Sequence, residues 1–261
     1  MNKDSAAGLS KVPEVTLIFW IIKIAATTLG ETGGDAVSMS MNLGYLIGTA
    51  IFAVLFALAV SAQIGARRFH PWLYWPTIVA TTTVGTTLAD FADRSLGIGY
   101  AGGSVLLLVL LLASLYIWYR MLGTVAVSSV SSPRAEMYYW ITIMFSQTLG
   151  TALGDWTADN AGLGLGYGGS ALVFGGALVL VAGLYLAPRV SRTALFWAAF
   201  ILTRPLGAVL GDFLDKPVAK GGLALSRYVA SAVLLAFMAL CILLFRQRAA
   251  AGADRADRSE S

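Results

Sequence analysis

The sequence predicts an all-α polytopic membrane protein with eight transmembrane helices, made of four parallel two-helix repeats. Three observations support this: the composition, the length of the apolar runs and an internal repeat. Of the 261 residues, 57% are hydrophobic and only 12% are charged, with a mean hydropathy of +0.75. A soluble domain needs more charge to cover its surface. Because backbone groups inside a bilayer must bond internally and the runs are too long for barrel strands, we expect helices.

The apolar runs approach or exceed the ~20 residues that cross ~30 Å of hydrocarbon. The expected helices span 15–34, 42–63, 72–92, 97–119, 136–156, 163–187, 194–213 and 222–245. They group into repeats at about 14–65, 70–121, 135–189 and 193–246, so residues 1–261 are expected to form one transmembrane domain. The polar tail, 247–261, is expected to be disordered.

One pattern begins each repeat and justifies the odd-numbered helices. An aromatic residue precedes a tryptophan, nine residues separate this tryptophan from a glycine, and four more lead to an aspartate. The copies are Trp20–Gly30–Asp35, Trp75–Gly85–Asp90, Trp140–Gly150–Asp155 and Trp197–Gly207–Asp212. The helices between them also repeat in part, as in "GIGYAGGS" at 97 and "GLGYGGS" at 164. A duplicated helical hairpin therefore explains the chain, and all copies enter the membrane from the same side.

The orientation follows from lysine and arginine. With both termini in the cytoplasm, twelve basic residues lie in inner segments and four in outer ones. This positive-inside bias predicts cytoplasmic termini in a bacterial inner membrane. The bias also explains the net charge of +4, so the bilayer is the expected partner and no nucleic-acid partner is expected. A homo-oligomer is compatible with the sequence.

The repeat aspartates are predicted to lie inside the membrane. Tryptophan favours the interface, and each aspartate follows its tryptophan by fifteen residues, or about 22 Å of helix. Each aspartate also has a companion acid three or four residues away, on the same helix face. The eight candidates for a metal site are Asp35, Asp90, Asp155, Asp212, Glu31, Asp93, Asp159 and Asp215. For Asp93, Asp159 and Asp215 the alternative is a loop cap at the outer surface.

Carboxylates at the C-terminal ends of helices are disfavoured, so these acids need protons, basic partners or a bound cation. Oxygen ligands without a His or Cys cluster suit a hard divalent cation, Mn²⁺-like, as a substrate rather than a tightly bound cofactor. Neutral oxygens are expected from Thr27, Thr28, Thr82, Thr83, Gln147, Thr148 and Thr203. Lys23 and Arg204, which have no basic counterpart in the other repeats, are predicted to be a gate or an internal counter-ion, or else a salt bridge that locks the bundle.

The glycines and tryptophans carry further expectations. The repeat glycines, near the middle of the membrane, are expected to break the helices and expose carbonyl oxygens. The small-xxx-small pairs predict close helix packing at Gly44/Gly48, Gly99/Gly103, Gly162/Gly166 and Gly164/Gly168. The repeat tryptophans are expected to anchor the helices at the interface.

The four copies at Trp20–Asp35, Trp75–Asp90, Trp140–Asp155 and Trp197–Asp212 resemble a bacterial family of integral membrane proteins with four repeats of roughly fifty residues and no assigned function. The resemblance covers nearly the whole chain and implies eight helices. The segments "GTALGD" and "GAVLGD", at 150–155 and 207–212, are also similar to the acidic Gly-Asp motifs of small manganese and calcium/proton exchangers. The copies "GETGGD" and "GTTLAD" depart from that motif.

The favoured function is a secondary transporter that exports a divalent metal cation in exchange for protons. The alternatives are a passive cation channel with an acidic selectivity ring, and a non-transporting membrane scaffold or intramembrane enzyme. No nucleotide-binding loop, Ser/His pair or HExxH motif occurs, so we do not expect an enzyme.

Overall fold

The computed structural model describes residues 9–251, and these residues form eight α-helices and one small sheet. The helices are α1 (Leu17–Asp35), α2 (Gly44–Gly65), α3 (Pro71–Asp90), α4 (Tyr100–Leu122), α5 (Pro133–Ala158), α6 (Gly166–Leu184), α7 (Arg192–Asp215) and α8 (Arg227–Leu244). Two π-helical segments, Ala36–Ser40 and Phe91–Ser95, directly follow α1 and α3. The eight predicted helices are confirmed, and their ends differ from the prediction by at most five residues.

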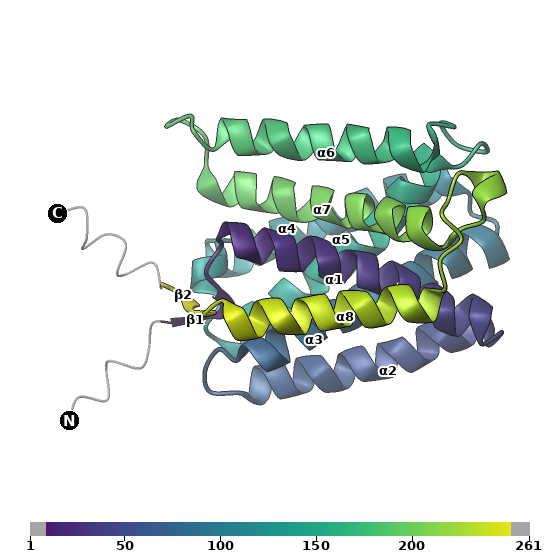
Figure 1. The fold of residues 1–261 in the computed structure, drawn as a ribbon. Helices are drawn as coiled ribbons and strands as arrows, with labels where there is room; N and C mark the ends of the chain where they lie inside the picture. Colours follow the sequence, from purple (N-terminus) through teal and green to yellow (C-terminus); the bar gives the residue numbers. More distant parts are fainter. Residues whose placement is uncertain (1–8, 252–261) are drawn as a thin grey trace, which may run out of the picture.

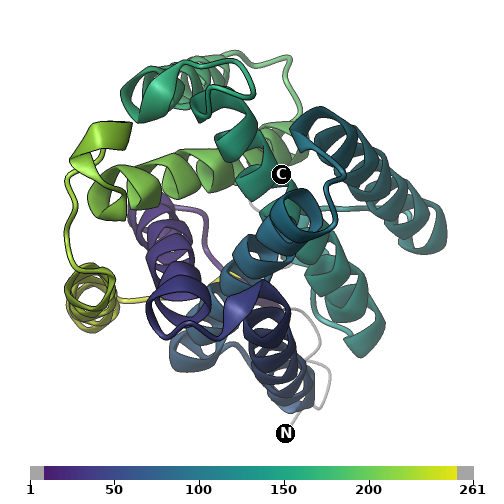
Figure 2. The same cartoon turned by 90° about the vertical axis from the view of Figure 1, so that its right-hand side faces the viewer.

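The odd-numbered helices form a closed inner ring (Figures 1 and 2). Within it, α1 packs against α3, α3 against α5, α5 against α7, and α7 against α1. The even-numbered helices lie outside this ring (Figure 2). Each packs on the odd helix of the following repeat, and α8 returns to pack on α1. The four repeats are therefore arranged cyclically.

Five of these helices combine enough length and hydrophobicity to cross a bilayer: α2, α4, α6, α7 and α8. Four of them are the outer helices, which expose leucine, valine and isoleucine side chains such as Leu58, Val109, Leu172 and Val233. The inner helices α1, α3 and α5 carry more threonine and acid, and face one another instead. This exposed apolar surface is typical of a protein that sits in a membrane.

The repeat glycines lie where neighbouring inner helices touch. The helices continue through all four, so the predicted break is wrong. Each glycine faces the residue three positions before the glycine of the next repeat, and a Cβ there would come within 3.0 Å of it. The pairs are Gly30 on Thr82, Gly85 on Gln147, Gly150 on Arg204 and Gly207 on Thr27. The glycines therefore allow the ring to close tightly.

The predicted small-xxx-small pairs contribute to packing at only two of their glycines. Gly44, Gly99, Gly164 and Gly166 have positive φ angles and lie where loops lead into the outer helices. Gly162, in the loop after α5, faces the carbonyl of Trp156 in the last turn of α5, and a Cβ on Gly168 would meet nothing within 4 Å. Two members do face another segment: Gly48 faces Thr87, and Gly103 faces Asp93. Glycine conformation, rather than helix packing, explains most of this pattern.

An aromatic layer fills one end of the ring. The aromatic residue before each repeat tryptophan contacts the tryptophan of the next repeat, with ring centroids 5.4–6.3 Å apart. These contacts are Phe19–Trp75, Tyr74–Trp140, Tyr139–Trp197 and Phe196–Trp20. Trp75, Trp140 and Trp197 are buried, so their predicted role as lipid-facing anchors is wrong, because they close the bundle core instead.

A two-stranded antiparallel sheet lies at the same end of the bundle (Figure 1). Strand β1 (Leu9–Pro13) pairs with β2 (Ala249–Ala251), which no sequence pattern predicted. The expected disorder of 247–261 is therefore wrong at 249–251, and residues 252–261 lie outside the described part. Lys11 in β1 forms an ion pair of 2.6 Å with Glu136 on α5. This contact links β1 to the third repeat.

Candidate functional site

The four repeat aspartates converge at the end of the ring opposite the aromatic layer. Asp35 and Asp90 are the last residues of α1 and α3, and Asp155 and Asp212 lie one turn before the ends of α5 and α7. All four are at most 5% exposed. Because the repeat pattern gives each the same position on an inner helix, the cyclic packing brings them together near the axis.

Basic side chains from the segments that follow the inner helices at this end of the bundle pair with these acids. Lys216, directly after α7, contacts Asp35 and lies 3.0 Å from Asp212. Arg227, at the start of α8, lies 2.7 Å from Asp215 and 3.7 Å from Asp35. Burial opposes the charge of Lys216, but the carboxylates of Asp212, Asp35 and Asp215 outweigh it and raise the pKa of this lysine.

A third base, Arg94, connects the second repeat, to which it belongs, with the third. It lies in the π-helical segment after α3, with Nε 3.1 Å from Asp90 and Nη2 3.4 Å from Asp155. Arg94, Lys216 and Arg227 are three of the four basic residues that the predicted topology places in outer segments, and the sequence did not assign any of them to a particular acid. A signal was present, since Arg94 and Lys216 each follow a repeat aspartate by four residues, the spacing of a helical ion pair.

Arg204 lies deeper along the axis and crosses it. Its side chain is fully buried, and Nη2 lies 3.0 Å from the Glu31 carboxylate on the neighbouring helix α1. The same nitrogen donates hydrogen bonds to Thr86, at 2.6 Å, and to Thr151. Glu31, Thr86 and Thr151 each directly follow a repeat glycine. One arginine therefore connects all four repeats, which favours the prediction of an internal counter-ion or lock.

Lys23 lies one layer nearer to the aromatic end. It is fully buried, and its Nζ lies 4.1 Å from the centroid of the Phe200 ring. No hydrogen-bond partner of this nitrogen is found within residues 9–251. Phe200 is one helical turn before Arg204, so the two buried bases occupy successive positions between the acids and the aromatic layer.

Two overlapping groups of carboxylates have the spacing of cation ligands. One oxygen each from Glu31, Asp35 and Asp90 lie within 4.8 Å of one another, and so do oxygens from Asp35, Asp212 and Asp215. Oxygens bound to one ion at 2.0–2.6 Å are separated by at most about 5 Å. Asp35 belongs to both groups, which makes it the centre of the arrangement.

The charges of this cluster do not balance. In the part of the chain that the structure describes, six carboxylates share four bases, so these ion-paired groups have a formal excess of two negative charges. Lys23 is not counted, because it forms no ion pair with any of the six. Asp35 Oδ1, Asp215 Oδ1 and Asp90 Oδ2 are buried without a hydrogen-bond partner among those residues. Buried anionic oxygens of this kind require a cation or a proton.

Two of the eight predicted acids lie apart from this cluster. Asp159 is exposed in the loop after α5, where it accepts hydrogen bonds from the Ala161 amide at 2.8 Å and the Tyr100 hydroxyl at 3.4 Å. This is the loop-capping role that the sequence left as its alternative. Asp93 is half-buried beneath Gly103, and burial raises its pKa.

The neutral ligands predicted before the repeat glycines also differ. Thr28, Thr83, Thr148 and Thr203 donate to carbonyl groups of their own helices. Thr27 does so too and also reaches the Thr203 carbonyl of α7, at 3.2 Å. Thr82 Oγ1 and the Gln147 side-chain amide have no hydrogen-bond partner in the described chain. Both residues lie three positions before a repeat glycine, as Arg204 does, and therefore at the same level of the ring. Within residues 9–251, none of these seven side chains forms a hydrogen bond with a carboxylate of the site.

Comparison with known proteins agrees with the repeat. Four segments match a family described as a Repeat of Unknown Function (DUF347), at residues 18–69, 73–124, 138–191 and 195–249. Each begins within four residues of the repeat predicted from the sequence. No curated protein and no solved structure matches the chain. With four copies that cover most of its length, the chain belongs to the DUF347 repeat family.

Proposed function

We propose that this protein is a secondary transporter that exports a divalent metal cation, Mn²⁺-like, across a bacterial inner membrane in exchange for protons. The observation that carries the proposal is the buried cluster of six carboxylates, of which Asp35 is the centre. A purely structural network of ion pairs would be expected to balance its charge, because uncompensated buried charge is costly. This cluster has two negative charges in excess of its bases.

The donor set favours a hard cation. The groups Glu31–Asp35–Asp90 and Asp35–Asp212–Asp215 offer carboxylate oxygens alone. Oxygen ligands suit Mn²⁺, Mg²⁺ and Ca²⁺, whereas Zn²⁺ and Cu⁺ prefer sites with nitrogen or sulfur. The lone cysteine, Cys241, lies on the outer helix α8, away from the acids.

The excess charge also suggests a stoichiometry. One bound divalent cation neutralises two negative charges, and so do two protons on the carboxylates. We therefore propose that two protons replace one metal ion, so that the cluster stays neutral in both loaded forms. A neutral cluster has the smallest electrostatic cost inside the low-dielectric membrane.

Closure of the axis supports a carrier rather than an open channel. Lys23, Arg204 and the aromatic layer occupy the axis between the acids and the end that carries β1 and β2. Ions could pass only if this part rearranged, as alternating access requires. In the proposed cycle Arg204 holds Glu31 when the site is empty and releases it when the metal ion binds.

The test is metal-driven proton movement in proteoliposomes that contain the purified protein and a pH-sensitive dye. An outward Mn²⁺ gradient should drive proton movement in the opposite direction. Asp35→Asn should reduce the rate at least about tenfold, since it removes a ligand common to both carboxylate groups. Asp159→Asn is the matched control, because it makes the same change in an exposed loop, and it should leave the rate unchanged.

A folding defect is distinguished by gel filtration and circular dichroism of Asp35→Asn. If a folded Asp35→Asn protein exchanged Mn²⁺ for protons like the wild type, the carboxylate cluster would not be the site. If the wild type moved Mn²⁺ without protons, the exchange mechanism would be wrong. If no Mn²⁺, Mg²⁺ or Ca²⁺ gradient produced any flux, the transport proposal would fail.

A further inference from the structure

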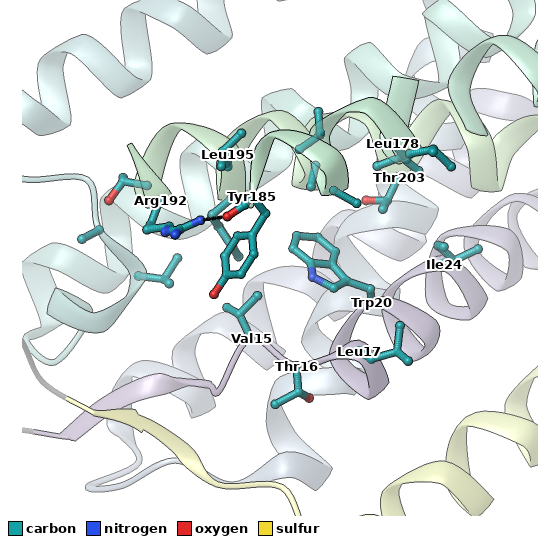
Figure 3. A pocket seen from close by; sticks show the side chains of 18 of the residues that line it. Val15, Thr16, Leu17, Trp20, Ile24, Leu178, Tyr185, Arg192, Leu195 and Thr203 are labelled. Carbon is teal, nitrogen blue, oxygen red and sulfur yellow. Dashed lines mark hydrogen bonds between the residues drawn. The ribbon is translucent and has the colours of Figure 1, made fainter. Parts of the chain in front are cut away.

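A cavity lies on the outside of the inner ring, away from the acids. It has a volume of about 680 Å³ and is bounded by α1, α6, α7 and residues 126–128 (Figure 3). Its size falls in the range of small-molecule sites in proteins. One end lies at Arg192 and Tyr185, where α7 begins and α6 has just ended. The other end lies at Ile24, Leu178 and Thr203 (Figure 3).

The shape and lining of this cavity match a hydrocarbon chain. Its walls are mainly apolar, with Leu17, Trp20, Leu178 and Phe196 among them. From Arg192 to Thr203, α7 advances eleven residues, or about 16 Å. One leaflet contributes half of the ~30 Å of hydrocarbon in a bilayer. The cavity is thus about as long as one leaflet is deep.

One end of the cavity carries positive charge. The Arg192 guanidinium stacks 4.1 Å from the centroid of the Tyr185 ring and donates a hydrogen bond to the Tyr185 carbonyl. No acidic residue lines the cavity, and no carboxylate of residues 9–251 pairs with Arg192. The hydroxyl-bearing residues Thr16, Ser128 and Thr193 lie in the same lining.

This charge belongs to one repeat only. The positions that correspond to Arg192 in the other repeats, fifteen residues before the glycine, are Val15, His70 and Ala135. The cavity therefore combines an apolar channel of one-leaflet depth with a single fixed guanidinium at the end of the bundle that carries β1 and β2. A guanidinium without a carboxylate partner is a recognition group for phosphate.

We propose that this cavity binds one anionic phospholipid from the leaflet on the β1–β2 side. One acyl chain fills the space between α1, α6 and α7, and Arg192 holds the phosphate of a headgroup that has no ammonium group to offset the phosphate charge. The proposal does not depend on transport, because none of the carboxylates of the candidate site lines the cavity.

The test is native mass spectrometry of the full-length protein released from detergent with phosphatidylglycerol or with phosphatidylcholine of the same acyl chains. Phosphatidylglycerol should bind at least about tenfold more tightly than phosphatidylcholine, which is the difference in affinity expected for one charge-assisted hydrogen bond. Arg192→Ala should abolish this preference. Arg189→Ala is the matched control, since Arg189 is an exposed neighbour that does not line the cavity, and it should keep the preference.

A second pair of variants tests the chain site. Ala182→Phe adds a ring inside the cavity and should weaken binding of both lipids, whereas Ala236→Phe adds the same ring on the exposed face of α8 and should not. Both alanines are exposed, so neither variant should prevent folding. Equal binding of the two lipids, or a preference that survives in Arg192→Ala, would overturn the headgroup contact. Unchanged binding in Ala182→Phe would overturn the cavity as the acyl-chain site.

Discussion

The buried pair of Arg204 and Glu31 gives the most direct test of the axis. Arg204 is 0% and Glu31 3% exposed, and the ion pair measures 3.0 Å. Arg204→Met leaves the Glu31 carboxylate without a partner, and Glu31→Gln leaves the arginine uncompensated. Removing one member of a buried pair costs about 3–5 kcal/mol of unfolding free energy. The double variant removes both charges. Its loss of unfolding free energy should therefore be about 3 kcal/mol smaller than the sum of the losses in the two single variants.

The assay is unfolding of the purified protein in mixed micelles, with increasing SDS and tryptophan fluorescence as the readout. Arg189→Met is the control, because it removes an exposed arginine and should change stability by less than about 0.5 kcal/mol. Additive losses in the double variant would refute the pairing of Arg204 with Glu31. A loss in Arg204→Met no larger than in Arg189→Met would refute the burial of this arginine.

Three further predictions concern the ring, the orientation and the transport charge. Gly85→Ala should destabilise the protein by about 1–3 kcal/mol, because its Cβ would lie 2.9 Å from the backbone of α5. Gly175→Ala, which meets nothing within 4 Å, should instead stabilise it by about 0.5–1 kcal/mol, and equal effects would contradict the ring packing. On a Cys241→Ser background, an impermeant maleimide applied to intact cells should label a cysteine placed at Leu163 and not one placed at Arg189. The reverse result would invert the predicted topology. Finally, Mn²⁺/proton exchange should be insensitive to an imposed potassium diffusion potential, whereas a potential-dependent rate would contradict the replacement of one metal ion by two protons.

The sequence predicts the helices and the repeat well because both are periodic features. Four tryptophans and four aspartates in the same register define the hairpins, and the apolar runs define their partners. The same register implies that equivalent residues meet, which is why the clustering of Asp35, Asp90, Asp155 and Asp212 could be predicted.

The rest depends on which helices are neighbours, and a single sequence does not contain that information. The sequence does not show that the repeat tryptophans face the axis, so Trp75 was expected at the lipid interface although it lies in the core. For the same reason Lys216 could not be assigned to Asp35, which is 181 residues away. The strand β2 consists of alanines in a polar tail, and its pairing with β1 leaves no local signal.

The packing of every outer helix on the next repeat has a consequence for biosynthesis. In the first hairpin to leave the ribosome, α2 does not cover the outside of α1. That surface is covered by α8, the last helix to be made. The ring therefore stays open until translation is almost finished, and chains that stop before Arg227 should be recognised by quality control as unassembled. The same geometry would allow separate single-hairpin chains to close an equivalent ring, each lending its second helix to the adjacent subunit.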